Sequence, residues 1–269
     1  MPFALGSRAA QAGYRLVAFD QTGSTNAEAL AHARQGERGP CWFVTTEQTA
    51  GRGRRSRPWI APRGNLASSV LELLDVAPAV AATLGFAAGL SIESALRQVS
   101  LEAALRAGGS GQFTFALKWP NDVLANGQKL CGILLEAEQV QAGLAVVVGI
   151  GTNVIAAPTG TPTPATSLKT LGIDIAAEDL FSALSDSWTE FRGIWNNGLG
   201  FGDIRRLWLE RAAGLGEAVA IRSGHAIIEG TFDTIDEQGC MVVRTREGRL
   251  VPITAGDVHF GSAASAGAV

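Results

Sequence analysis

An uncharged apolar stretch, residues 76–92, restricts the folds open to this chain more than any other feature. It reads VAPAVAATLGFAAGLSI and is bracketed by Asp75 and Glu93. Its length is at the lower limit for a membrane-spanning helix, which needs about 17–25 residues. Proline is favoured in the first turn of a helix, so Pro78 marks a natural starting point. We therefore expect a helix over residues 78–99, buried in a protein core, and no membrane span.

The segments around this helix predict a mixture of strands and helices. Apolar or alternating runs predict strands over 14–20, 41–48, 65–74, 113–119 and 144–154. The dipeptide Asn126-Gly127 predicts a hairpin over 123–139, because this pair is typical of tight two-residue turns. Helices are expected from about residue 26 to 36, 176 to 196 and 202 to 213, and the Pro- and Thr-rich segment 156–168 is expected to be a loop.

The pattern of apolar and polar residues changes after Gly214. Short alternating segments follow, separated by the turn signals SG, QG and EG, and such a pattern is typical of a small all-β module. A chain of 269 residues is long enough for one large domain and a small one. We therefore predict one domain over 1–213, a β domain over 214–262, and a disordered tail over 263–269.

Composition and missing motifs exclude several classes of protein. The formal net charge of -3 argues against a general nucleic-acid binder, which usually has a basic face. The three cysteines are widely spaced, so we expect reduced thiols in a cytoplasmic protein. The sequence has no GxxxxGK[ST], GxGxxG, GxSxG or HExxH motif. The three histidines stand apart, and we expect no histidine-based metal or acid–base site.

A glycine- and arginine-rich segment carries the strongest functional signal. Residues 51–57, GRGRRSR, follow an expected strand and contain four arginines. Glycine allows a close backbone approach to a ligand, and guanidinium groups bind phosphate oxygens in a two-pronged geometry. The segment therefore suits a phosphate clamp that is mobile when empty and ordered by an anion. A solvated basic loop or a nucleic-acid contact would have the same composition.

Other polar positions are individually ambiguous. Lys118 ends a strand within KWPND and can either point into a pocket or extend to solvent. Asn121 and Asp122 suit the following turn, and the STN segment of residues 24–26 suits a helix cap. Gln48 can hydrogen-bond to an amide- or urea-like ligand as both donor and acceptor. Asn153 follows the glycine turn of GIGTN.

The joint order of these motifs is more specific than any one of them. STN, EQTAGRGRRSRPW, KWPND, KLCGILLE and VVVGIGTNV follow one another along the chain. In this order the sequence resembles the biotin protein ligases, over about residues 19–260. The resemblance implies an α+β fold with a mixed, largely antiparallel central sheet flanked by helices, like that of class II aminoacyl-tRNA synthetases. It also implies a small C-terminal SH3-like β-barrel.

The resemblance implies an activity as well. Such enzymes join biotin to ATP as biotinyl-5′-AMP with release of pyrophosphate, and then transfer the biotinyl group to a lysine of a biotin carboxyl carrier protein. ATP, biotin and Mg²⁺ carried by ATP are the expected ligands, with no metal bound by a His/Cys cluster. The strand before STN begins by about Tyr14, so a DNA-binding domain and a repressor role are not expected, whereas a homodimer is compatible with the family.

By similarity, the site residues divide into three groups. The expected catalytic residues are Lys118, Arg52 and Arg54. The expected biotin-binding residues are Ser24, Thr25, Asn26, Gln48, Gly51, Arg52, Gly53, Arg54, Lys118 and Gly132. The expected ATP- and adenylate-binding residues are Arg52, Arg54, Trp59, Lys118, Asn121 and Asn153. Asp122 is a weaker candidate for assisting proton transfer.

Two departures from the family pattern concern the pocket walls. Ala67 stands where many relatives carry an aromatic residue, and the 156–168 loop lacks the tryptophan that some members place over adenine. Two alternatives also remain open. One is a lipoate- or other acyl-protein ligase of the same fold, and the other is a non-enzymatic nucleic-acid-binding module that uses the arginine segment.

Overall fold

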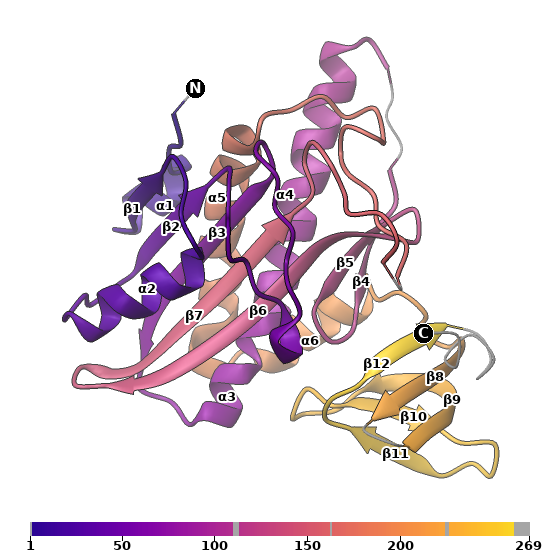
Figure 1. The fold of residues 1–269 in the computed structure, drawn as a ribbon. Helices are drawn as coiled ribbons and strands as arrows, with labels where there is room; N and C mark the ends of the chain where they lie inside the picture. Colours follow the sequence, from indigo (N-terminus) through magenta and orange to yellow (C-terminus); the bar gives the residue numbers. More distant parts are fainter. Residues whose placement is uncertain (1, 110–112, 162, 224–225, 261–269) are drawn as a thin grey trace.

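The computed structural model describes residues 2–109, 113–161, 163–223 and 226–260. A seven-stranded sheet lies between helices, and a five-stranded sheet lies at one end of it (Figure 1). The larger sheet has the order β1-β2-β3-β7-β6-β5-β4, with β1 and β2 parallel and its other neighbours antiparallel. Its strands are β1 (Arg15–Phe19), β2 (Cys41–Thr45), β3 (Leu66–Leu74), β4 (Phe115–Lys118), β5 (Asp122–Ala125), β6 (Gln128–Val140) and β7 (Gly143–Thr152). The predicted mixed, largely antiparallel sheet is confirmed.

Helices cover both faces of this sheet. The helices are α1 (Ser7–Gln11), α2 (Thr25–Arg34), α3 (Pro78–Ala82), α4 (Leu84–Arg106), α5 (Ala177–Trp195) and α6 (Phe201–Leu209), with 3₁₀ turns η1 (Arg54–Ser56) and η2 (Asn196–Gly198). Helix α2 packs on one face, and α4 and α5 pack on the other (Figure 1). Successive side chains of a strand point to opposite faces of the sheet. Phe43 of β2 therefore packs in a small apolar cluster with Ala29 and Ala33 of α2, whereas Trp42 belongs to the larger core on the other face.

The apolar stretch forms buried helices, as its sequence predicts. A break at Thr83 separates α3 from α4, and α4 continues to Arg106, further than the expected residue 99. By length and composition alone, Pro78–Arg106 could cross a membrane, but 72% of its most apolar window is buried inside the protein. Packing against the sheet and α5 therefore accounts for its apolar composition.

The long antiparallel strands β6 and β7 form the centre of the sheet. Strands β5 and β6 form a hairpin that turns at Asn126 and Gly127, which have φ angles of 48° and 78°. Two successive positive φ angles define the turn that Asn-Gly favours, because it matches the twist of the flanking strands. The predicted hairpin is confirmed.

The C-terminal sheet lies against the end of the central sheet. Its strands are β8 (Ala218–Ser223), β9 (Ala226–Ile235), β10 (Met241–Arg244), β11 (Leu250–Ile253) and β12 (Asp257–Phe260), in the antiparallel order β11-β10-β9-β8-β12. The linker before it extends the edge of β4, because the Leu117 amide donates to the Arg211 carbonyl and the Ala213 amide donates to the Leu117 carbonyl, each at 2.8 Å. This pairing places the small sheet beside Lys118. The predicted disordered tail, 263–269, lies outside the described residues.

Candidate active site

A cavity of about 440 Å³ opens where the central sheet meets the C-terminal sheet. We call residues 51–58 the flap; it forms one wall, and the start of α2, strands β6 and β7, and β12 form others. The predicted site residues in the lining are Ser24, Thr25, Asn26, Gln48, Arg52, Gly53, Arg54, Trp59, Lys118, Asn121, Gly132 and Asn153. The chain therefore gathers at one place side chains that the sequence spreads over 130 positions.

Gly51 is not part of this lining, although we expected it to bind biotin. It is buried at the base of the flap, where its carbonyl accepts a hydrogen bond from the Trp59 amide at 2.9 Å. A Cβ atom at this position would lie 2.5 Å from the Trp59 carbonyl oxygen. The absence of a side chain at Gly51 thus serves the folding of the flap against the segment that follows it.

Glycines on β6 and β7 form a flat floor to the cavity. Gly132 pairs with Gly151 across the two strands, and Gly149 lies two residues earlier on the same face. A Cβ at Gly151 would be 2.4 Å from Trp59 Nε1, and one at Gly132 would be 3.0 Å from Trp59 Cζ3. The Trp59 indole therefore lies directly on the strand backbones. Ala67, which lies opposite Gly151 on β3, keeps the same face shallow.

The STN turn caps α2 and also faces the cavity. Ser24 is the N-cap and accepts a hydrogen bond from the Ala27 amide at 3.4 Å, so the capping interpretation is confirmed. Gln48 Oε1 accepts from the Thr25 amide at 2.8 Å and from the Thr25 hydroxyl at 3.1 Å. The amide side chain of Gln48 is thereby held against the start of α2.

A hydrogen-bonded chain continues from this turn to the flap. Ser69 Oγ lies 2.7 Å from Thr25 Oγ1 and 2.6 Å from Asn26 Oδ1. Asn26 Nδ2 donates to Glu136 at 2.8 Å, and Arg52 pairs with the other oxygen of Glu136 at 3.4 Å. Ser69 and Glu136 were not predicted, because strand register determines their neighbours and neither residue lies in a recognisable local motif.

Two ammonium groups lie in the cavity, of which only one was predicted. Lys118 ends β4, with Nζ 5.4 Å from the centroid of the Phe260 ring. Lys129 Nζ pairs with Asp122 at 2.6 Å and lies 5.6 Å from the Trp59 ring centroid. Burial lowers the pKa of Lys118; the charge of Asp122 opposes this effect and that of Lys129 adds to it. Lys129 was missed although the KLCG segment that contains it was part of the motif set.

The arginines of the flap all contact other parts of the protein. Arg54 donates to Asn121 Oδ1 at 3.2 Å, across the cavity mouth. Arg55 and Arg57 both pair with Asp257 of β12. Together with the Arg52 pair, these contacts offset the mutual repulsion that four close cations would otherwise have.

The remaining wall comes from Asn153 and the loop after it. Asn153 is 1% exposed, and its Nδ2 donates to the Thr166 carbonyl at 3.1 Å. Its Oδ1 is buried and has no hydrogen-bond partner among the described residues, although buried polar atoms are normally paired. The expected loop 156–168 contributes Pro158, Thr161, Thr163 and Ala165 to the lining.

One residue of the cavity was not singled out from the sequence. His259 of β12 lines the cavity. Burial lowers its pKa, and the charge of Lys118 adds to the effect. Its position depends on the docking of the C-terminal sheet, which the sequence spacing does not disclose. Within the described ranges, no group of three His, Cys, Asp or Glu residues could hold a metal ion.

The arrangement suits a ligand with both an anionic and an amide-like part. Arginine and lysine side chains line the cavity together with the hydroxyl and amide groups at the start of α2. Cations fixed at a partly buried site stabilise negative charge more than they would in water. The fold and the cavity thus define a protein that can hold and join two anionic reactants.

Comparison with known protein families gives the class. The model of the "Biotin/lipoate A/B protein ligase family" matches residues 18–153, and that of the "Biotin protein ligase C terminal domain" matches residues 214–261. The chain belongs to the biotin/lipoate A/B protein ligase family.

Individual relatives share most of the chain. A biotin–[acetyl-CoA-carboxylase] ligase of Paracoccus denitrificans is 39% identical over 248 residues, covering 90% of this chain and 98% of that protein. One of Mycobacterium tuberculosis is 36% identical, covering 88% and 86%. The fold is similar to that of the Aquifex aeolicus biotin protein ligase in complex with biotin and ATP, with a TM-score of 0.73, 24% identity, and coverage of 92% and 98%.

Proposed function

We propose that the protein attaches biotin to a specific lysine of a biotin carboxyl carrier protein in an ATP-dependent reaction. The observation that carries this proposal is one cavity that combines the arginine flap, Lys118 and the polar start of α2. Family membership and the similarity to two biotin–[acetyl-CoA-carboxylase] ligases support the choice of reaction and carrier.

The reaction has two steps. In the first, a carboxylate oxygen of biotin attacks the α-phosphorus of ATP, the bond to the β-phosphate oxygen breaks, and pyrophosphate leaves. In the second, the neutral amine of the carrier lysine attacks the carbonyl of the mixed anhydride, AMP leaves, and the amine loses a proton as the amide forms. The first step brings two anions together, and fixed cations offset that repulsion.

The charged residues of the cavity have complementary roles in the first step. Arg52 and Arg54 project from the flap, and Lys118 and Lys129 project from the sheet. We assign Arg52, Arg54 and Lys118 to the reacting carboxylate and phosphate, with Lys129 as a further cation. Binding of an anion would draw Arg52 away from Glu136, to which its 3.4 Å contact is long for a charged pair.

The neutral residues of the cavity suit the two ends of the intermediate. Ser24, Thr25, Asn26 and Gln48 offer hydroxyl and amide groups for the ureido ring, which has both N–H donors and a C=O acceptor. Gly132 and Gly53 allow a close approach of backbone to ligand. The adenylate is assigned to three further lining residues, which are Trp59, Asn121 and Asn153.

The rest of the assignment follows from this reaction. Mg²⁺ would enter with the ATP phosphates as part of the substrate. Residues 1–213 would form the ligase domain and residues 214–262 the β domain beside it. We place the reaction in the cytoplasm, where biotin, ATP and the carrier are available, and pairing of two copies as a homodimer stays a prediction.

Labelling in parallel reactions tests the choice of substrate. Purified protein is incubated with ATP and a biotin carrier domain, with radiolabelled biotin in one reaction and radiolabelled lipoate in another. We expect biotin in the carrier and background levels of lipoate. Preferential incorporation of lipoate would replace the proposal with that of a lipoate ligase, and absence of both labels would contradict the acyl-ligase assignment.

A further inference from the structure

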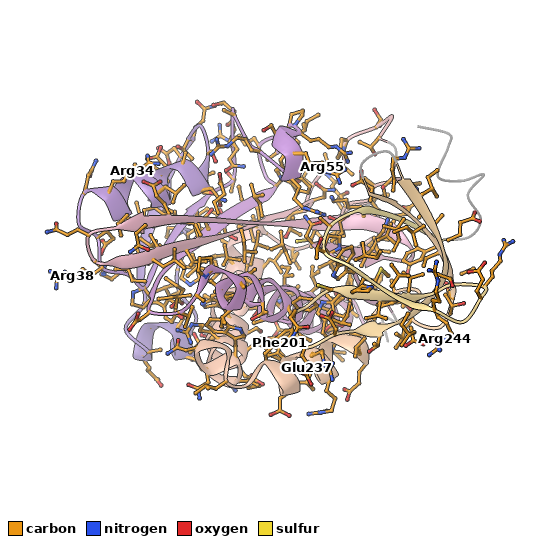
Figure 2. All side chains as sticks on the ribbon, turned by 90° about the horizontal axis from the view of Figure 1, so that it is seen from below. Arg34, Arg38, Arg55, Phe201, Glu237 and Arg244 are labelled. Atoms are coloured by element: carbon orange, nitrogen blue, oxygen red, sulfur yellow. The ribbon has the colours of Figure 1, made fainter. Side chains whose placement is uncertain are left out.

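The C-terminal sheet makes a direct ionic contact with the flap. Arg55 Nη1 donates to Asp257 Oδ2 at 2.7 Å, and Arg57 Nη2 donates to the same oxygen at 3.0 Å. Asp257 is the first residue of β12, some 200 residues further along the chain. Figure 2 labels Arg55 where the flap approaches the C-terminal sheet. One carboxylate of the small sheet thus holds two of the four flap arginines.

The charge environment of Asp257 favours this contact. Burial alone would raise the pKa of its carboxyl group. The hydrogen bond and charge of Arg57, with the charges of Arg55 and Arg54, outweigh burial and lower the pKa below its ordinary value. The negative charge of Asp257 offsets two neighbouring cations that otherwise repel one another.

The backbone conformation of the flap is costly and requires stabilising contacts from outside the flap. Arg55 and Ser56 have φ angles of 55° and 58°, a left-handed conformation that is costly for residues other than glycine. The Gly53 amide donates to the Arg57 carbonyl at 2.7 Å and closes the turn. Contacts from outside the flap can compensate for this local cost. The Arg55–Asp257 bond is a charged contact of one of these two residues, and the Arg57–Asp257 bond is made by the residue that follows them.

The same contact sets the direction of the neighbouring arginines. With Arg55 and Arg57 held by β12, Arg54 donates to Asn121, between β4 and β5, and Arg52 pairs with Glu136 of β6. Asp257 itself also lines the cavity. If the contact broke, the turn would be free to unwind and these two arginines would lose their fixed positions.

We propose that Asp257 is a positioning residue that holds the flap over the cavity, and that the C-terminal sheet is thereby part of the lid of the active site. This inference rests on the proposed function, in which the lid keeps water from the mixed anhydride until the carrier arrives. The partner groups are Arg55 and Arg57, and the ligand retained is an acyl adenylate.

A matched ion pair in the same sheet provides a control. Arg244 pairs with Asp233 at 2.6 Å, and its side chain is 50% exposed, against 45% for Arg55. Isolated surface ion pairs contribute little to stability, so an effect confined to Asp257 would reflect its position beside the flap. Neither member of the control pair lines the cavity.

Limited proteolysis of the ligand-free protein with subtilisin tests the contact. We expect Asp257→Asn to be cut within the flap roughly 5- to 30-fold faster than the parent protein, a range that corresponds to a loss of about 1–2 kcal/mol in the free energy of flap opening. Asp233→Asn should be cut at the parent rate. Combining Asp257→Arg with Arg55→Asp and Arg57→Asp should restore protection, because the charges are exchanged.

A second measurement separates positioning from general stability. With biotin and ATP but no carrier, Asp257→Asn should release AMP several-fold faster, because the anhydride meets water, while Asp257→Glu should stay close to the parent. Equal flap cleavage in Asp257→Asn and parent, or equal acceleration in Asp233→Asn, would overturn the inference. The cleavage assay needs no substrate, so a parent protein that forms no adenylate would refute the proposed function and leave the test of the flap contact intact.

Discussion

Removal of the Lys118 ammonium is the sharpest test of the proposed chemistry. Lys118→Met keeps most of the side-chain shape and removes the charge. A cation about 4 Å from an anion contributes on the order of 4 kcal/mol at an effective dielectric constant of 20. Because Arg54 and Lys129 remain in the cavity, part of this stabilisation would persist. We therefore expect a loss of about 10²- to 10³-fold in the rate of adenylation, the usual effect of removing one charge-stabilising donor.

The assay is biotin-dependent exchange of labelled pyrophosphate into ATP, which reports the first step alone. Lys129→Met should be more damaging than Lys118→Met, because it also leaves the Asp122 carboxylate without its partner at 2.6 Å. Adding Asp122→Asn to Lys129→Met should restore part of the lost rate. Exchange by Lys118→Met within twofold of the parent would refute the assigned role, and a double variant slower than Lys129→Met would refute the reasoning about Asp122.

Three further predictions concern the cavity and its flap. The adenylation rate should fall as pH rises through the pKa of Lys118, because the ammonium is the active form. Burial lowers this pKa, so the alkaline limb of the pH–rate profile should lie below about 10.4, the pKa typical of an exposed lysine. Lys118→Arg should move this limb to higher pH. A pH–rate profile with no such limb below about 10.4 would contradict this. Gly151→Ala should weaken biotin binding about 5- to 150-fold in calorimetry. The added Cβ would lie 2.4 Å from Trp59 Nε1 and force the indole to move, and such overpacking costs about 1–3 kcal/mol. Unchanged affinity would show that the indole moves without an energetic cost and would contradict this reasoning. Biotin plus ATP should protect the flap from proteolysis, and equal cleavage with and without ligands would argue against a flap that closes on an anion.

Most of the fold could be predicted from local sequence patterns. Strand alternation, the Asn126-Gly127 turn and the apolar stretch after Pro78 each depend on neighbours within a few residues. The break at Thr83 and the continuation of α4 to Arg106 were not predicted, because the apolar pattern fades beyond residue 99 while the helix continues. The mixed, largely antiparallel character of the sheet came from the family resemblance, and the order of its strands was not predicted.

The site could be predicted where motifs carry it and not where tertiary contacts build it. The flap, Lys118 and the STN turn were found because they lie within short characteristic segments. Ser69 and Glu136 join the site only through strand register, and Asp257 and His259 join it only through docking of the C-terminal sheet. Residues of this second kind have no local signal, because the contacts that give them a role come from distant parts of the chain.

The shape of the cavity also depends on packing that the sequence does not disclose. Trp59, which was expected among the adenylate-binding residues, lies on the backbones of Gly132 and Gly151. A ligand that uses the same floor would have to share it with the indole or displace it. This arrangement connects the shape of the pocket to the position of the flap, because Trp59 directly follows the flap in the chain.

Intact-protein mass spectrometry of a carrier domain tests the central claim most directly. The carrier is incubated with the protein, ATP and biotin, and parallel reactions omit each component in turn. The account predicts that the carrier gains the mass of one biotinyl group on a single lysine, and only in the complete reaction. An unmodified carrier, or biotin incorporation without ATP, would contradict it.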